Sequence, residues 1–153
     1  MAGPVWDKSM VPLAQFLESN VELFRSEAEH FMDFDELSLG ATAQESWPSG
    51  AWKAVALTGR ACDRLPQSCK VLQREELRCE YAGAKLVRMR PQARLKPHFG
   101  AAPQLQLHLA LRAELGAHLS VGNRSLSWQT GEALVIDSSF IRQARDSKEI
   151  KGD

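Results

Sequence analysis

The 153-residue sequence predicts a mainly β fold with N-terminal helices, an α+β arrangement in which a helical layer packs on an antiparallel sandwich or jelly roll. Two observations carry this prediction. Apolar residues recur at helical spacing near the N-terminus. From Ala84 onward the period changes to two, and short strands are separated by turn residues. The length suits one domain with a single core.

The first predicted element is one helix from Pro12 to Phe31. Proline suits a first helical turn because its missing N–H is not needed there. The apolar residues of this segment lie three or four apart, as on one face of a helix, and are expected to be core: Leu13, Phe16, Leu17, Val21, Phe24, Ala28 and Phe31.

Short elements follow. Ala51 to Leu57 predicts a short apolar strand, and a short helix is expected near the cysteines, within residues 63–77. Gly122 and Asn123 predict a hairpin turn. In the second half, strands are expected at Lys85–Arg90, Gln104–Arg112, His118–Val121, Ser125–Trp128 and Ala133–Ile136.

The clearest strand alternates without interruption. Its leucines share one face, which we expect to pack on a second layer such as the N-terminal helix. Gln104, Gln106 and His108 share the other face. Two interpretations of that polar face remain open. It lines a wet, ligand-sized cavity, or it is the solvated side of a half-exposed sheet.

Composition excludes some classes of function. Nineteen basic residues balance nineteen acidic ones, so there is no overall field that would attract nucleic acid or an anionic membrane. No apolar run is long enough for a membrane span, and the N-terminus lacks the apolar core of a signal peptide. We expect a cytosolic protein, or the soluble part of something whose targeting segment is absent. Of three cysteines, Cys62 and Cys69 bracket a loop and are either a small disulfide or, as composition favours, ordinary thiols.

Four short motifs occur in a fixed order: PHFG (97–100), HLAL (108–111), W-x-x-G-E (128–132) and DSSF (137–140). Upstream lie SEAEHFMD and CDRLPQSC. This ordered set resembles the aspartyl/asparaginyl β-hydroxylase family of Fe(II)- and 2-oxoglutarate-dependent oxygenases. The resemblance runs from about Pro12 to about Phe140.

The resemblance implies a double-stranded β-helix, a cupin-like jelly roll. It implies hydroxylation of the β-carbon of Asp or Asn in protein substrates, with Fe(II) and 2-oxoglutarate as cofactors. Animal members act on epidermal-growth-factor-like domains in the endoplasmic reticulum, usually from a membrane-anchored chain. By this match His98 is the metal ligand and His108 a contact of 2-oxoglutarate. The match also favours a Cys62–Cys69 disulfide.

The sequence departs from the family pattern at several positions. Arg142 stands where the second iron histidine is expected, and arginine offers donors only, so it cannot ligate iron. Gln106 replaces an arginine that binds 2-oxoglutarate, and is a weak substitute because it carries no charge. Val87 replaces a cofactor serine. A further arginine and a D-x-W-H-P ending are absent, which predicts a jelly roll incomplete at its C-terminus.

These observations give a domain over residues 1–140 and a polar, disordered tail over 141–153. A basic run from Lys85 to Lys96 is expected to form a solvated face, because with Val87 toward the cavity Arg88 and Arg90 face away.

The sequence leaves two candidate functions. One is a dioxygenase with an incomplete site. The alternative is a catalytically inactive or shortened member that binds a peptide or an organic acid. The resemblance implies localisation in the endoplasmic reticulum. If the chain is complete, a cytoplasmic localisation is expected instead.

Overall fold

A computed structural model describes residues 5–32, 34, 46–47, 52–74, 83–90, 94–98, 105–113, 117–137 and 142–146. Its helices are η1 (Lys8–Met10), α1 (Pro12–Ser19), α2 (Val21–Ala28), α5 (Gly59–Arg64) and α6 (Pro66–Leu72). Its strands are β1 (Val5–Trp6), β2 (Ser46–Trp47), β3 (Trp52–Ala56), β4 (Lys85–Met89), β5 (Arg94–His98), β6 (Leu105–Leu109), β7 (Ala117–Val121), β8 (Arg124–Ser127), β9 (Ala133–Asp137) and β10 (Arg142–Asp146).

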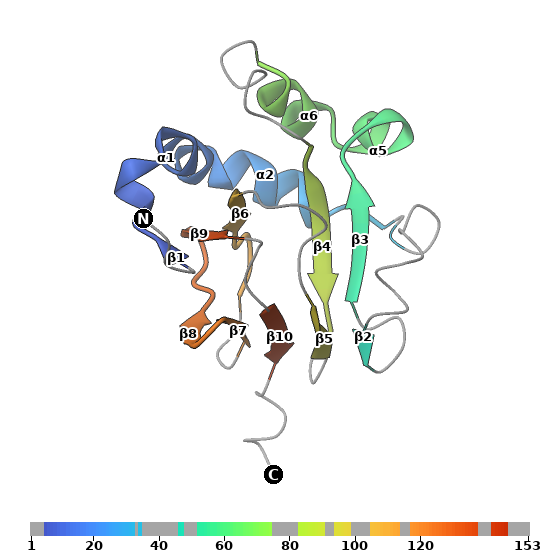
Figure 1. Ribbon diagram of the computed structural model, residues 1–153. Coiled ribbons are helices and arrows are strands. Elements are labelled where there is room, and N and C mark those ends of the chain that lie inside the picture. The colour runs from blue at the N-terminus through green and yellow to red at the C-terminus, as the bar shows by residue number, and fades with distance from the viewer. Residues whose placement is uncertain are drawn as a thin grey trace.

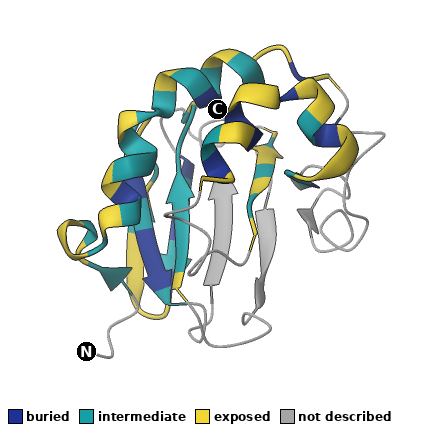
Figure 2. Cartoon of the chain, turned by 90° about the horizontal axis from the view of Figure 1, so that it is seen from above, coloured by how far each residue is buried: buried dark blue, intermediate teal, exposed yellow. Residues whose placement is uncertain are grey.

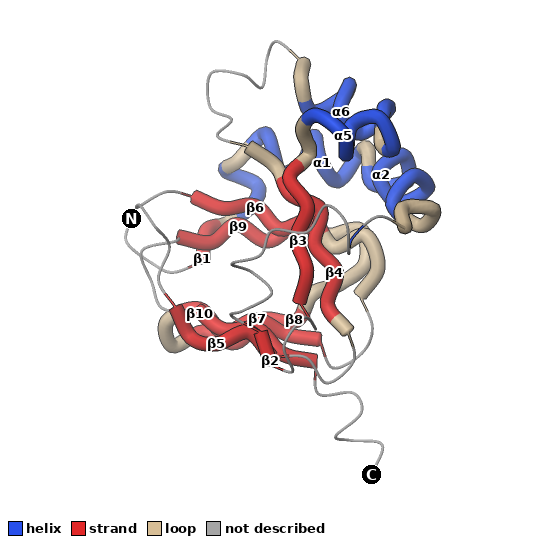
Figure 3. The backbone as a smooth tube through the Cα atoms, turned by 90° about the vertical axis from the view of Figure 1, so that its right-hand side faces the viewer, coloured by secondary structure: helices blue, strands red, loops and turns tan. Residues whose placement is uncertain are grey.

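The described strands form three antiparallel sheets, with the strand orders β1-β9-β6, β2-β5-β10-β7-β8 and β3-β4. In Figure 3 the first two sheets lie as separate layers, and the helices gather at the end of the molecule nearer β6 and β9 (Figures 1 and 3). The α+β prediction is confirmed at this level. Among the described strands no pairing closes a barrel. No helix in the described ranges is long and apolar enough to cross a bilayer.

The single helix predicted for Pro12 to Phe31 is two helices. Pro12 begins α1, as predicted, but α1 ends before Asn20, whose φ of −108° and ψ of 12° leave the helical region. The side-chain amide of Asn20 donates a hydrogen bond to the backbone carbonyl of Phe16 at 2.8 Å, and the hydroxyl of Ser19 donates to the same carbonyl. Short polar side chains compete in this way with the backbone hydrogen bonds of a helix. The apolar residues keep their helical spacing on both sides of Asn20, so the sequence pattern gave no sign of the break.

The predicted strands of the second half are present, including the β7–β8 hairpin, where Gly122 has a φ of 58°. The predicted disordered tail is wrong for Arg142–Asp146. This segment is β10, and it pairs with β5 on one side and β7 on the other. Both edges of the strand therefore have hydrogen-bonding partners, which its polar sequence does not reveal. Residues 147–153 lie outside the described part.

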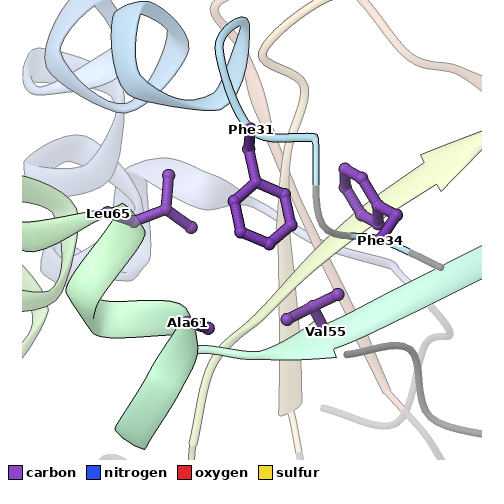
Figure 4. Packing of buried hydrophobic residues seen from close by; sticks show 5 residues of the cluster. All are labelled: Phe31, Phe34, Val55, Ala61 and Leu65. Carbon is purple, nitrogen blue, oxygen red and sulfur yellow. The ribbon is translucent and has the colours of Figure 1, made fainter. Parts of the chain in front are cut away.

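The leucine face of β6 packs as predicted. Leu107 and Leu109 contact a buried cluster that includes Ala14 of α1 together with Ala133 and Val135 of β9. A second cluster joins the helices to β3 (Figure 4). Its buried members are Phe31, Phe34, Val55, Ala61 and Leu65, with the two phenylalanine rings edge to face at 5.0 Å. The helices mix exposed and buried positions, as helices covering a core should (Figure 2).

Glu18 links the N-terminal helix to the sheet. Its carboxylate accepts a hydrogen bond from the Lys8 ammonium at 2.7 Å and another from the backbone N–H of Ala133 at 2.8 Å. The Lys8 hydrogen bond, and then the Ala133 N–H, lower the pKa of Glu18 below its ordinary value of 4.5. The same carboxylate raises the pKa of Lys8. One carboxylate thus holds η1, α1 and the start of β9 together.

Glu27 performs a similar role for α6, which has no side-chain cap of its own. Its carboxylate accepts from the backbone N–H groups of Gln67 and Ser68 at 2.9 and 2.7 Å, and from the Ser68 hydroxyl at 2.7 Å. A carboxylate supplied by α2 therefore satisfies the first turn of α6, where unpaired N–H groups favour a negative charge. A Cys62–Cys69 disulfide then joins α6 to α5.

We predict that Glu18→Gln lowers the free energy of unfolding by about 1–2 kcal/mol at pH 7, because a charge-assisted pair becomes a neutral one. Since the folded-state pKa of Glu18 is lowered, its stabilisation is present above pH 4.5 and is lost as the pH falls through the lower folded value. Urea unfolding at a series of pH values should show the variant and the native chain converging as the pH falls below 4.5. An equal deficit at pH 7 and at the lowest pH of the series would contradict this assignment.

We also predict that Glu27→Ala destabilises the chain by about 1–2 kcal/mol, the usual cost of a lost helix cap. Glu27→Gln should cost less, because the amide oxygen still accepts hydrogen bonds. Glu29→Ala is the matched control, since Glu29 is exposed at the end of the same helix and should change stability by about 0.5 kcal/mol or less. Thermal and urea unfolding measure all three. A loss in Glu29→Ala equal to that in Glu27→Ala would contradict the capping role.

Candidate functional site

The polar face of β6 faces the second sheet. Gln106 pairs with Ile136 of β9, and His108 pairs with Leu134, so these residues share one face. Ile136 is fully buried and packs with Leu119 and Val121 of β7, which belongs to the other sheet. The face that carries Gln106 and His108 therefore borders the space between the two layers. Both residues are half-buried, so this face is neither fully solvated nor part of the core.

The imidazole of His108 stacks on the indole of Trp128. The rings are nearly parallel, with an interplanar angle of 15° and centroids 6.3 Å apart. Trp128 in turn packs against the inter-sheet cluster of Leu119, Val121 and Ile136. The histidine ring thus lies beside a half-buried side chain that packs against the core. The sequence contained this tryptophan in the W-x-x-G-E motif, but nothing in the motif indicated its partner.

The other layer places Arg142 directly opposite His98. These positions are partners in the antiparallel pairing of β10 with β5, and Arg142 is also the partner of Val121 in β7. Directly opposite positions belong to the same face of an antiparallel sheet. Positions 98 and 142 therefore share the face of Val121, which is the face turned toward β6 and β9. The residue expected as a metal ligand and the arginine that departs from the family pattern are neighbours.

A bulge brings position 98 to this face. Arg142 pairs with His98 and Ala144 pairs with Leu95, so three steps along β5 correspond to two along β10. Lys96 and Pro97 together oppose one residue of β10. The extra residue reverses the alternation, which puts positions 95 and 98 on one face. Proline lacks an N–H and is found inside sheets chiefly at such irregularities. The bulge therefore accommodates Pro97 within β5, a strand that the sequence did not predict.

β4 contributes the Val87 position. Met89 packs against the inter-sheet cluster, and Val87, two residues earlier, shares its face. Leu86 packs instead on the helical cluster, and the Arg88 guanidinium lies over the Phe34 ring at 4.5 Å. The expectation that Arg88 faces away from Val87 is confirmed. Val87 is 41% exposed, so this part of the inner face is open.

The remaining histidines belong elsewhere. His118 alternates with the buried Ala117 and Leu119 and so lies on the outer face of β7. The ring of His30 lies 2.9 Å from the carbonyl of Ser26 at the end of α2.

The residues present do not fit a two-histidine iron centre. The register pairs His98 with an arginine, which has no lone pair to offer a metal and adds a positive charge beside it. Among the described side chains, no three His, Cys, Asp or Glu residues gather into a group suited to a metal ion. Where the sequence predicts the second histidine, the strand register therefore places an arginine opposite His98.

We predict that Trp128→Ala lowers the free energy of unfolding by about 1–3 kcal/mol, because a half-buried aromatic residue leaves the inter-sheet cluster. Trp128→Phe should cost less and keep an aromatic ring near His108. The His108 ring signals in NMR spectra should move in Trp128→Ala and remain closer to native in Trp128→Phe. Unchanged His108 signals in both variants would show that the indole does not orient the imidazole.

One family model matches the chain, that of aspartyl/asparaginyl β-hydroxylase, and it covers residues 18–151. The match includes α2, the disulfide and the strands from β2 to β10, and so extends beyond Phe140, where the motifs in the sequence ended. Among curated proteins, none matches this chain. The family model spans most of the residues of the chain and covers both His98 and Arg142. The chain belongs to the aspartyl/asparaginyl β-hydroxylase family.

Proposed function

We propose that this chain is a member of the hydroxylase family whose metal centre is incomplete and that it acts as a binding module for a peptide or an organic acid. The pairing of Arg142 with His98 carries this proposal. An iron site built on His98 needs a second ligand close to it, and the position beside it carries a permanent cation instead. Iron(II) stands low in the affinity order of divalent metals, so one imidazole beside a cation should hold it poorly.

The fold retains the setting of such a site. We infer that the two antiparallel layers are those of a double-stranded β-helix, which their facing inner surfaces support. Gln106 and His108 then occupy the cofactor side of the space, opposite His98 and Arg142. An amide such as that of Gln106 can hydrogen-bond a carboxylate without adding charge, and the His108 ring lies nearly parallel to that of Trp128. These residues suit binding of an acid better than they suit catalysis.

The family match favours a second candidate, an active hydroxylase. Aspartyl and asparaginyl residues are parts of polypeptides, so the family acts on protein substrates. Under this candidate the chain, loaded with Fe(II) and 2-oxoglutarate, would hydroxylate the β-carbon of Asp or Asn, for instance in epidermal-growth-factor-like domains. The Cys62–Cys69 disulfide supports an oxidising compartment such as the endoplasmic reticulum for either candidate.

Titration with Mn(II), a redox-inert substitute for Fe(II), together with 2-oxoglutarate separates the two candidates. We expect the native chain and His98→Ala to bind Mn(II) equally weakly. Arg142→His should gain affinity by about tenfold or more, since even changes outside the ligand set alter metal affinity by that amount. The gain should vanish in the double variant. In a separate assay with Fe(II) in place of Mn(II), turnover should stay absent in Arg142→His, because Gln106 still replaces the arginine of the cofactor site.

Gln143→His is the matched control for this experiment. It introduces a histidine on the same strand, but position 143 belongs to the outer face and pairs with Ser120. It should leave Mn(II) binding at the native level. Tight Mn(II) binding by the native chain that is lost in His98→Ala would overturn the binding-module proposal and move the enzyme candidate ahead.

A further inference from the structure

We propose that Asn123, at the tip of the β7–β8 hairpin, is an N-glycosylation site. Residues Asn123, Arg124 and Ser125 form the sequence Asn-x-Ser, with a residue other than proline in the middle, which is the acceptor sequence for N-linked oligosaccharides. This modification goes beyond the proposed binding function. It shares with that proposal only the oxidising compartment that the Cys62–Cys69 disulfide supports.

The hairpin presents the acceptor to solvent. Val121 pairs with Arg124 across the turn, so Gly122 and Asn123 are the residues of the loop. Gly122 has a φ of 58°, which a residue without a Cβ adopts at no steric cost, and this sets the turn at that position. All residues from 122 to 125 are exposed. A glycan on the Asn123 side chain therefore extends into solvent, and the folded domain accommodates it without displacing a core residue.

The serine of the acceptor sequence lies on the outer face of the hairpin. Ser125 pairs with Ser120 of β7, whereas the next pair along the hairpin is Leu126 with Leu119. Leu119 is 2% exposed, and Leu126 packs against the same inter-sheet cluster, so the leucines occupy the inner face. Since side chains alternate along a strand, the two serines occupy the outer face. Neither Asn123 nor Ser125 is needed for the packing of the sheet.

Turn chemistry explains only half of this sequence. Asparagine is common in a hairpin loop beside glycine, so Asn123 by itself would indicate no more than a turn. The turn makes no demand on Ser125, two residues later and already within β8. It is therefore the exposed serine at this spacing that carries the proposal.

The other asparagine of the chain has a structural role. Asn20 is followed by Val21 and Glu22, which do not complete an acceptor sequence. Its side-chain amide donates a hydrogen bond to the carbonyl of Phe16 at 2.8 Å, at the end of α1. The amide nitrogen of Asn20 is thus engaged within the fold, and this residue provides an internal control for Asn123.

The reaction needs a lipid-linked diphosphate oligosaccharide as donor. The bond between the anomeric carbon of the first sugar and the diphosphate oxygen breaks. A bond forms from that carbon to the side-chain nitrogen of Asn123, which loses one proton, and the lipid diphosphate leaves. No group is oxidised or reduced. The transfer takes place in the lumen of the endoplasmic reticulum, where a disulfide such as Cys62–Cys69 also persists.

The test is translation of the full chain, preceded by an added signal peptide, in the presence of microsomes. The added peptide ensures entry into the lumen, so the result depends on the acceptor sequence alone. We expect one discrete decrease in electrophoretic mobility that peptide N-glycosidase reverses. That enzyme should leave aspartate at position 123, which mass spectrometry of the released peptide detects.

Four variants locate the glycan. Asn123→Gln and Ser125→Ala should each lose the mobility shift, because each breaks the acceptor sequence. Ser125→Thr keeps the hydroxyl and should keep the shift. Asn20→Gln is the matched control, since it removes an asparagine outside any acceptor sequence, and it should also keep the shift.

An unshifted native chain, or a shift that persists in Asn123→Gln, would overturn the glycosylation site. Ser125→Thr guards against a loss of the shift through misfolding, since any change at position 125 that prevented modification by disrupting the hairpin would abolish the shift there as well. A negative result would leave the binding proposal standing, because titrations of the unglycosylated chain with Mn(II) test that proposal separately.

Discussion

The insertion of β10 between β5 and β7 is the constraint on which the rest of this structure depends. It completes the five-stranded sheet, and it sets the register that aligns His98, Arg142 and Val121. Val121 then packs with Ile136 across the space between the layers. A one-residue slip of β10 would exchange its two faces and bring Gln143 to the inner side in place of Arg142. The chemistry of the site therefore follows from hydrogen bonds of the backbone.

The bulge in β5 is equally necessary for the alignment of His98 with Arg142 and Val121. Without its extra residue, positions 95 and 98 would belong to opposite faces of the sheet. A proline at this place both fits the irregularity and prevents the strand from returning to a regular ladder, because it cannot donate a hydrogen bond. The local departure from ideal pairing is thus what places position 98 on the same face as position 95.

Two carboxylates attach the helices to this framework over long distances in the chain. Glu18 reaches the N–H of Ala133, and Glu27 caps α6 from α2. Neither replaces hydrophobic contact, since Ala14 and Phe31 bury the adjoining surfaces. Each carboxylate fixes how these apolar surfaces are aligned, because a charged oxygen with fixed N–H partners tolerates little displacement. Ala133, held by Glu18, begins the strand that pairs with Gln106 and His108, so the helical layer also supports one side of the site.

The sequence by itself determined those features that depend on local periodicity. The alternation of Leu105 to Leu109 assigned the leucines to the helical side and Gln106 and His108 to the other, and the Gly122 turn defined a hairpin, because side chains alternate strictly along a strand. The motif order indicated the family and identified Arg142 as the departure. Tertiary structure alone decided that a polar segment, 142–146, is a central strand, that Pro97 lies in a bulge, and that Trp128 stacks on His108. Each depends on a partner far away in the chain, and no local pattern of residues encodes such a partner.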